Sequence, residues 1–317
     1  MPEDKNDLVS RLASPVVVAC HDAGAANLLF AWLRDWARSG LLDDYVFRLV
    51  LGGPAEAAWG SLNMNLPHAE IYTELGRALQ GANSVLTGTG WASSLEHDAR
   101  KLASALRIPT TAVVDHWVNY PERFERGNEV VLPDEIWVAD SYAAAIAGRL
   151  FKNVRVLELS NTYLQEQVKN IPAASDGSRT LLYVLEPLRM DWGRETPGEF
   201  QALDFFAQHL HLIVGSQPVQ VMLRPHPSDQ PHKYDDWAKD HPRLSIKIDL
   251  NTSLSQSIGQ ARWVVGAETF ALVVANAAGR QTYSSLPPWA HRCRLPQQKI
   301  VHLCDLVEAR NSTQTRW

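Results

Sequence analysis

The chain has 317 residues, of which 45% are hydrophobic and 21% charged, and its formal net charge is −5. This length suffices for two ordinary domains with a sizeable core in each, and the composition is typical of soluble globular proteins. The acidic balance excludes a general basic field for gripping nucleic acid.

The first half of the chain alternates apolar, strand-like runs with segments of helical spacing. The predicted strands are residues 15–20, 45–53, 69–73, 83–91, 108–114, 134–141 and 154–161. The predicted helices are residues 25–38, 55–62, 95–106 and 142–151. Regular alternation of strand and helix favours a mostly parallel sheet with right-handed crossovers.

A segment rich in small residues, Asp and Pro, residues 170–179, predicts a linker, and the pattern restarts after it. The predicted strands of the second half are residues 179–187, 219–224, 244–250, 261–268 and 281–288. Its predicted helices are residues 200–214, 254–260 and 269–280, and we expect residues 311–317 to be disordered or to lie on the surface. We therefore expect an α/β protein with two tandem Rossmann-like domains, 1–169 and 180–317, and a cleft between them.

The three cysteines, Cys20, Cys293 and Cys304, are odd in number and lack the spacing of a metal site. We expect no disulfide framework, no metal centre and a reducing compartment. The first ten residues are acidic and polar, unlike a secretory signal, and no apolar run reaches the roughly 18 residues that cross a bilayer. The sequence therefore predicts a cytoplasmic protein.

The stretch VQVMLRPHPSD, residues 219–229, predicts a buried strand that ends in Arg224 and His226 between prolines. Arg presents a planar fork of donors, and His a donor whose charge changes near neutral pH. Ligands of open α/β sheets collect outside the carboxyl ends of strands, so this loop predicts an anion site. The alternative is a capped loop in which both side chains pair with nearby acids.

Two strand ends of the first half also carry polar side chains. His21 and Asp22 follow the strand 15–20, and Gly24 permits a tight turn there; Asp115 and His116 follow the strand 108–114. Asp22 is either the N-cap of the next helix or a base that faces a cleft. The loop lacks a complete G-x-G-x-x-G, so dinucleotide binding is not supported.

Two further strand ends of the second half hold Glu186 and the pair Glu268 and Thr269. Thr269 opens a helix, where free N–H groups and the helix dipole favour an anion, unless it is only a cap. Glu268 suits a ribose hydroxyl or an Arg better than a phosphate. Glu186 contacts a ligand or pairs with Arg189.

The segment ARWVVGAETFALVVANAAGRQTYSSLPP, residues 261–288, and the two tandem halves resemble the carboxy-terminal half of GT-B glycosyltransferases. The pair His226-Pro227 is similar to that of bacterial sialyltransferases and of Kdo or nonulosonate transferases. CDP-glycerol-type phosphotransferases have a comparable Arg-x-His-Pro. The paired acids and Gly of sialyltransferases have only partial counterparts here, in residues 21–24 and 114–116.

The resemblance implies a glycosyltransferase that moves a sugar, such as Kdo or sialic acid, from a nucleotide donor, expected to be CMP-linked, to a surface glycan acceptor. It places the acceptor in the amino-terminal domain and the donor in the carboxy-terminal domain. It requires no cofactor, no metal and no nucleic acid, and it leaves peripheral association with the inner membrane open.

The roles that follow are expectations. The donor-binding residues are Glu186, Arg224, His226, Glu268 and Thr269; the acceptor-side residues are His21, Gly24 and His116. His226 stabilises the departing phosphate, and Asp22 or Asp115, or else His21 or His116, deprotonates the acceptor hydroxyl. The alternatives are a UDP-sugar epimerase or hydrolase, a CDP-glycerol-type phosphotransferase, and a non-catalytic nucleotide- or glycan-binding protein.

Overall fold

The computed structural model describes residues 3–61, 66, 68–173, 175, 177–188, 190–251 and 253–314. The chain divides into two compact units, Met1–Tyr163 (unit 1) and Leu164–Trp317 (unit 2). Helix α7 (Thr162–Lys169) begins at the end of unit 1 and directly precedes the expected linker at 170–179. The expected domain limits of 1–169 and 180–317 stay a prediction.

Unit 1 contains a seven-stranded sheet in the order β3-β2-β1-β4-β5-β8-β9, with every neighbouring pair parallel. Its strands are β1 (Val16–Cys20), β2 (Phe47–Leu51), β3 (Ala69–Ile71), β4 (Ser84–Thr87), β5 (Thr110–Val114), β8 (Glu135–Val138) and β9 (Arg155–Glu158). All seven lie within strands predicted from the sequence. The chain adds β2 and β3 on one side of β1 and the later strands on the other, so the strand order switches between β1 and β4. Ligands of open α/β sheets bind at such switch points.

Strand β1 is buried on both faces, which explains its unbroken apolar sequence. Val16, Val18 and Cys20 belong to the core cluster that also contains residues of the long helix that follows β1, whereas Val17 and Ala19 belong to a second cluster on the other face. The helices of this unit are α1 (Lys5–Val9), α2 (Ala23–Arg38), α3 (Pro54–Ser61), α4 (Leu75–Leu79), α5 (Leu95–Ala105) and α6 (Ser141–Leu150).

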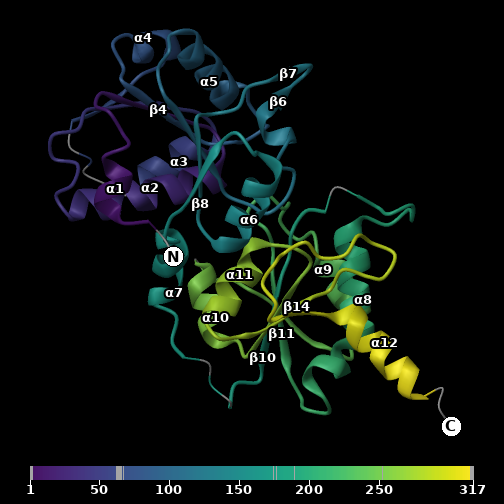
Figure 1. Ribbon diagram of the computed structural model, residues 1–317. Helices are drawn as coiled ribbons and strands as arrows, with labels where there is room; N and C mark the ends of the chain where they lie inside the picture. Colours follow the sequence, from purple (N-terminus) through teal and green to yellow (C-terminus); the bar gives the residue numbers. More distant parts are fainter. Residues whose placement is uncertain are drawn as a thin grey trace. The chain divides into compact units, whose positions relative to one another are not determined.

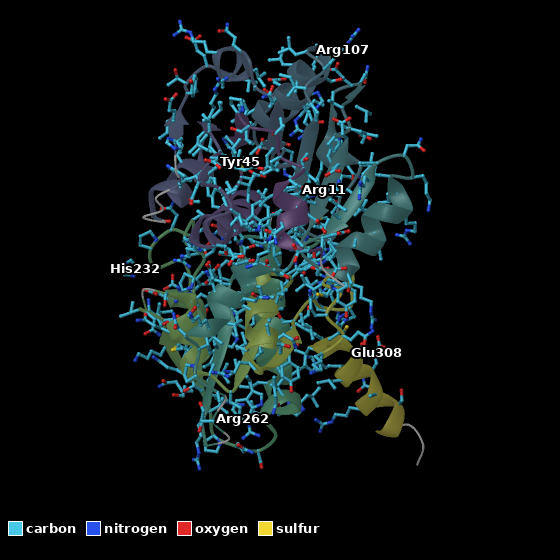
Figure 2. All side chains as sticks on the ribbon, turned by 60° about the vertical axis from the view of Figure 1, so that its left-hand side comes forward. Arg11, Tyr45, Arg107, His232, Arg262 and Glu308 are labelled. Atoms are coloured by element: carbon cyan, nitrogen blue, oxygen red, sulfur yellow. The ribbon has the colours of Figure 1, made fainter. Side chains whose placement is uncertain are left out.

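The sequence did not predict five short elements of unit 1: α1, α4, the 3₁₀ turn η1 (Glu122–Phe124), and the antiparallel strands β6 (Glu125–Arg126) and β7 (Glu129–Val130). The segment after α1 is anchored by Arg11, labelled in Figure 2, whose Nη1 lies 2.6 Å from a carboxylate oxygen of Glu135. These elements are too short to show a periodic pattern, and tertiary contacts hold them.

Unit 2 contains a six-stranded parallel sheet in the order β12-β11-β10-β13-β14-β15. Its strands are β10 (Thr180–Val184), β11 (Gln220–Arg224), β12 (Ser245–Ile248), β13 (Trp263–Gly266), β14 (Gln281–Ser284) and β15 (Ile300–His302). Its helices are α8 (Gly198–Val214), α9 (Asp235–Asp240), α10 (Leu254–Gln260), α11 (Phe270–Ala277) and α12 (Leu303–Gln314). Helices α8 and α12 cover one face of the sheet and α10 and α11 the other (Figure 1).

The end of unit 2 differs from the expectation. The last predicted strand, 281–288, is β14, but β15 adds a further strand and α12 continues to Gln314. Asn311 and Ser312 are exposed on the last helical turn, which agrees with the surface position that was one of the two alternatives expected for the end of the chain. Among the residues that the structure describes, none of the helices combines the length and apolar character needed to cross a membrane.

Candidate functional site

The polar residues that follow β1 and β5 in unit 1 form one group, which we call site 1. Its members are His21, Asp22, Gly24, Glu96, Asp115 and Arg123. Strand β4 lies between β1 and β5, so the group gathers at the carboxyl ends of three adjacent strands, next to the switch point.

Asp22 occupies the N-cap position of α2 with an extended backbone, but among the described contacts its side chain makes no capping hydrogen bond. Its carboxylate instead lies against Gly90, where an added Cβ atom would be 2.1 Å from Oδ2. Oδ1 is 3.6 Å from Nδ1 of His21, and 34% of the side chain is exposed. The described contacts therefore do not support the capping role, and the role of a base that faces a cleft stays a prediction.

Asp115 lies directly against the first turn of α2. A Cβ atom added at Gly24 would be 1.8 Å from Asp115 Oδ2, so only glycine permits this approach. Arg123, which the sequence interpretation missed, places Nη1 2.7 Å from Asp115 Oδ1 and also donates to Thr89 Oγ1 at 3.2 Å. Asp115 is therefore held in a charge-assisted pair with Arg123.

Glu96 is a second residue that the sequence did not reveal. It is fully buried in α5, and Oε1 accepts hydrogen bonds from the backbone N–H groups of His21 at 2.7 Å and Asp22 at 3.5 Å. Burial raises the pKa of this carboxyl group above its usual value. Glu96 therefore holds the backbone of the loop after β1 in place through these hydrogen bonds.

The two histidines of unit 1 lie in different surroundings. The ring of His21 covers Gly53, where an added Cβ atom would be 2.6 Å from Nε2. His116 packs against Trp117, with ring centroids 5.3 Å apart, and Trp117 donates to Asp140 at 2.9 Å. The structure therefore brings His21 to Asp22 and Gly24 to Asp115, and it packs His116 against an aromatic ring.

The loops after β10, β13 and β14 in unit 2 form a second group, site 2, which lies at the switch point between β10 and β13. Its members are Glu186, Glu268, Thr269, His291 and Arg294. The carboxylate of Glu186 accepts a short hydrogen bond from the backbone N–H of Glu268. Burial raises the pKa of Glu186 to about 7, the carboxylate of Glu268 adds to this effect, and Arg294 opposes it.

Glu268 is paired with Arg294, which is one of the two roles expected for it. Arg294 donates to Glu268 Oε1 from Nε at 2.8 Å and from Nη2 at 2.6 Å, and its backbone N–H donates to Oε2 at 2.7 Å. Nε2 of His291 lies 3.4 Å from the same carboxylate. Both basic residues come from the loop between β14 and β15; the run His-Arg-Cys-Arg at 291–294 was the available sequence signal.

Thr269 caps α11, because its Oγ1 accepts the backbone N–H of Ala271 at 3.3 Å. The capping role left open by the sequence is therefore present. Arg189, the expected partner of Glu186, lies outside the described residues.

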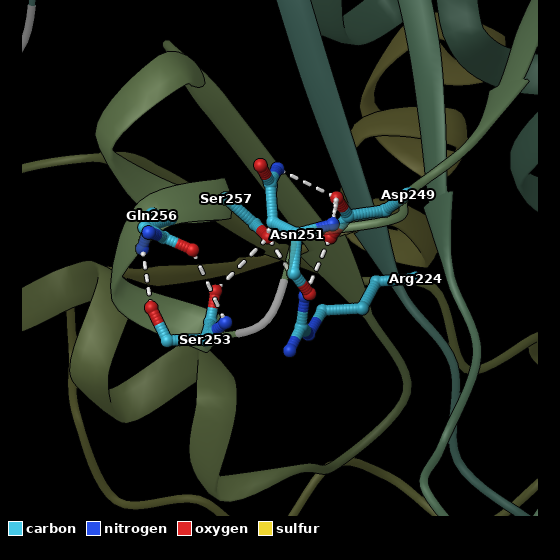
Figure 3. Close-up of polar contacts among 6 residues, drawn as sticks. All are labelled: Arg224, Asp249, Asn251, Ser253, Gln256 and Ser257. Carbon is cyan, nitrogen blue, oxygen red and sulfur yellow. Dashed lines mark hydrogen bonds and ion pairs between the residues drawn. The ribbon is translucent and has the colours of Figure 1, made fainter.

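Arg224 points into a polar network that closes the carboxyl ends of β11 and β12 (Figure 3). Its Nη1 lies 2.7 Å from Asp249 Oδ2, 2.8 Å from Ser257 Oγ and 3.2 Å from the backbone oxygen of Asn251. The Asp249 side chain is fully buried, whereas that of Arg224 is 20% exposed. This is the arrangement of the alternative interpretation, in which the arginine pairs with a nearby acid.

His226 is exposed and separately held. Its backbone N–H donates to Asp229 at 2.9 Å, and the N–H of Ser228 donates to its Nδ1 at 3.2 Å. Because Nδ1 accepts this bond, the proton of the neutral ring is on Nε2. His226 therefore offers an N–H donor at the surface of unit 2.

No protein-family model and no curated protein sequence matches the chain. Solved structures of similar fold include a UDP-N-acetylglucosamine 2-epimerase described as putative, from Listeria monocytogenes, with a TM-score of 0.60, 11% identity, and coverage of 96% of this chain and 89% of that one.

The UDP-GlcNAc 2-epimerase from Neisseria meningitidis bound to UDP-GlcNAc aligns with a TM-score of 0.58, 8% identity, and coverage of 95% and 91%. MurG from Acinetobacter baumannii aligns with a TM-score of 0.51, 10% identity, and coverage of 96% and 91%. These identities establish architecture alone. With its two parallel α/β sheets, the chain has the two-domain GT-B fold that these structures share.

Proposed function

We propose that the chain is a glycosyltransferase that uses a nucleotide-sugar donor. The observation that carries the proposal is site 2. At the switch point of a parallel sheet, a carboxyl group with a pKa of about 7, Glu186, adjoins a second carboxylate, Glu268, whose charge is balanced by Arg294. His291 lies 3.4 Å from the same carboxylate. Ionisable groups with perturbed pKa values at such a position are typical of functional sites.

The donor is assigned to unit 2. Arg294 brings positive charge to the donor side, and Glu268 accepts a hydrogen bond from a ribose hydroxyl when it is not fully engaged with Arg294. The exposed Nε2–H of His226 donates to the phosphate oxygen on which charge grows as the nucleotide leaves. Arg224 supports this loop rather than the phosphate, because its Nη1 is engaged with Asp249.

The acceptor is assigned to site 1, with Asp22 as the base. Its carboxylate is partly exposed and has no arginine within the described contacts, in contrast to Asp115. In the proposed step the acceptor hydroxyl gives its proton to Asp22, and its oxygen forms a bond to the anomeric carbon. The bond from that carbon to the donor phosphate breaks, and its electron pair leaves with the nucleotide.

The more specific part of the proposal is the identity of the nucleotide in the donor. The similarity of His226-Pro227 to CMP-sugar transferases favours a CMP-linked nonulosonate, whereas the Neisseria neighbour is bound to UDP-GlcNAc. Calorimetric titration with CMP, CDP, UDP and GDP separates these donors. Failure of all four to bind at millimolar concentration would overturn the proposal, and preference for CMP over UDP would support its finer form.

A second function, that of a UDP-sugar epimerase or hydrolase, is favoured by one specific observation. A carboxyl group with a pKa of about 7, Glu186, can both take and give a proton near neutral pH. Release of free nucleotide from UDP-GlcNAc without an acceptor would favour this function over transfer. Binding of CDP with transfer of a phosphoalcohol indicates a phosphotransferase, and binding without turnover indicates a non-catalytic protein.

A further inference from the structure

Three potential metal ligands of different chemical type meet at the end of β15 and the start of α12. One nitrogen of His302, Sγ of Cys304 and one carboxylate oxygen of Asp305 all lie within 4.8 Å of one another. His302 ends β15 and α12 begins at the next residue, so no flexible loop separates the three. The sequence interpretation expected no metal and passed over these neighbours because their spacing matches no established motif.

A small cavity of about 100 Å³ adjoins the cluster, and both His302 and Cys304 line it. The opposite wall is the loop between β14 and β15, which contributes His291 and Cys293. Glu308, labelled on α12 in Figure 2, lines the same cavity one helical turn after Cys304. The space is therefore large enough for an ion with a water molecule, and it is surrounded by groups that bind metals.

We propose that His302, Cys304 and Asp305 bind a zinc ion, with a water molecule or Glu308 in the fourth position. A thiolate and an imidazole beside a single carboxylate select zinc over magnesium or calcium, which prefer oxygen ligands. Ligand atoms of tetrahedral zinc lie roughly 3.5 Å apart, so the three side chains need movements of about 1 Å. On binding, the Cys304 thiol releases its proton to solvent and a zinc–sulfur bond forms.

Arg292 is the group that competes with the ion. Its Nη2 lies 2.6 Å from Asp305 Oδ2, while Oδ1 of the same residue is 3.7 Å from Cys304 Sγ. The Arg292 side chain is 66% exposed, and such surface ion pairs are weak, so a divalent ion displaces it. Because the cavity is lined by both the β14–β15 loop and α12, a bound ion cross-links these two segments.

The test is a cobalt titration of the 317-residue protein after treatment with a chelator. Cobalt replaces zinc in such sites and gives a thiolate charge-transfer absorption that reports a sulfur ligand directly. We expect this absorption to saturate at one equivalent and to disappear when zinc is added. Absence of the absorption in the unaltered protein would overturn the proposal.

Two cysteine variants make the test specific. Cys304→Ser should abolish the absorption and weaken zinc binding at least about 100-fold, since the loss of even an outer-shell partner costs 10- to 100-fold. Cys293→Ser is the matched control, because Cys293 lines the same cavity outside the cluster, and it should retain the absorption. The opposite pattern would place the site elsewhere and overturn the assignment.

Two further variants guard against misfolding. If Cys304→Ser loses its native circular dichroism spectrum, His302→Asn is measured instead. We expect the same loss of zinc affinity, and unchanged affinity would count against the proposal. Arg292→Gln should tighten zinc binding by about threefold or more, because it removes the competing cation. Weaker binding in Arg292→Gln would contradict the geometry described here. Both results are independent of the nucleotide titrations.

Discussion

Sites 1 and 2 both lie at the carboxyl ends of strands beside the switch point of their sheet, yet the carboxylates of the two sites have different contacts. In site 1, glycines allow the carboxylates of Asp22 and Asp115 to approach the backbone closely, and Arg123 reaches Asp115 from the unit's own interior. In site 2, the balancing Arg294 comes from a long loop, and Glu186 has no such cation at hydrogen-bond distance among the described contacts.

The comparison teaches that topology sets where polar groups gather, whereas close contacts set what each group can do. Asp22 is left as a partly exposed carboxylate that can accept a proton. Glu186 is kept near its midpoint of protonation at neutral pH by burial. The same type of sheet thus holds a partly exposed carboxylate in unit 1 and a carboxyl group with a raised pKa in unit 2.

The largest effect is expected from Arg224→Met. The substitution leaves the fully buried Asp249 carboxylate without its cation and should lower the free energy of unfolding by about 3 kcal/mol. Urea denaturation measures this. His226→Ala, two residues further on and exposed, should change stability by less than about 0.5 kcal/mol while lowering turnover. If Arg224→Met were as stable as the unaltered protein, the pair with Asp249 would not be structural, and Arg224 could bind a ligand instead.

Asp22→Asn should lower kcat about 100-fold or more, because it removes the proposed base. The isosteric amide keeps the shape of the side chain, so the melting temperature should stay nearly unchanged. Asp44→Asn, at an exposed turn position of the same unit, is the matched control and should retain full activity. Full activity in Asp22→Asn would transfer the role to Asp115 or a histidine.

Gly24→Ala tests the close approach on which site 1 depends. The new Cβ atom would overlap Asp115 Oδ2, so the carboxylate must leave Arg123, and we expect a loss of about 2 kcal/mol in the free energy of unfolding. Gly148→Ala in α6, where an added Cβ atom meets nothing within 4 Å, should instead stabilise the chain by about 1 kcal/mol. Similar values for both variants would contradict the described contact.

The smallest effect concerns the pH dependence of stability. The folded pKa of Glu186, about 7, exceeds the usual 4.5, so the folded state holds this proton more tightly. The resulting stabilisation is complete below about pH 4.5 and is lost as the pH rises through 7; its size is about 1–2 kcal/mol after allowance for partial exposure.

Glu186→Gln should remove this slope from urea denaturation curves recorded between pH 4.5 and 8. The exposed Glu195→Gln should retain it and serves as the control. A slope that persists unchanged in Glu186→Gln would assign the titration to another group.

Local patterns were sufficient to predict the strands of both sheets down to β14, because apolar runs bounded by Gly, Pro and Asp are readable over a few residues. They also predicted that Asp22, Asp115, Glu186 and Glu268 lie at strand ends, and each comes within two residues of the end of a strand. They did not locate β15 (Ile300–His302).

Two of the residues that the sequence interpretation missed, Glu96 and Arg294, have partners that are distant in sequence. Glu96 meets His21 across 75 positions, and Arg294 meets Glu268 across 26. In each case a charged residue on a helix or loop resembles an ordinary solvated group until the fold supplies its partner. Arg224 shows the converse, since its position suggested a ligand and its contacts are structural.

Strand β15 has a practical consequence for shortened versions of the chain. It pairs in parallel with Thr282, Tyr283 and Ser284 of β14. Deletion from residue 300 onward would leave the backbone amides and carbonyls of that neighbour unpaired, and exposed strand borders of this kind template association between molecules. Such a truncated protein should therefore precipitate or form oligomers, even though every residue of sites 1 and 2 is retained.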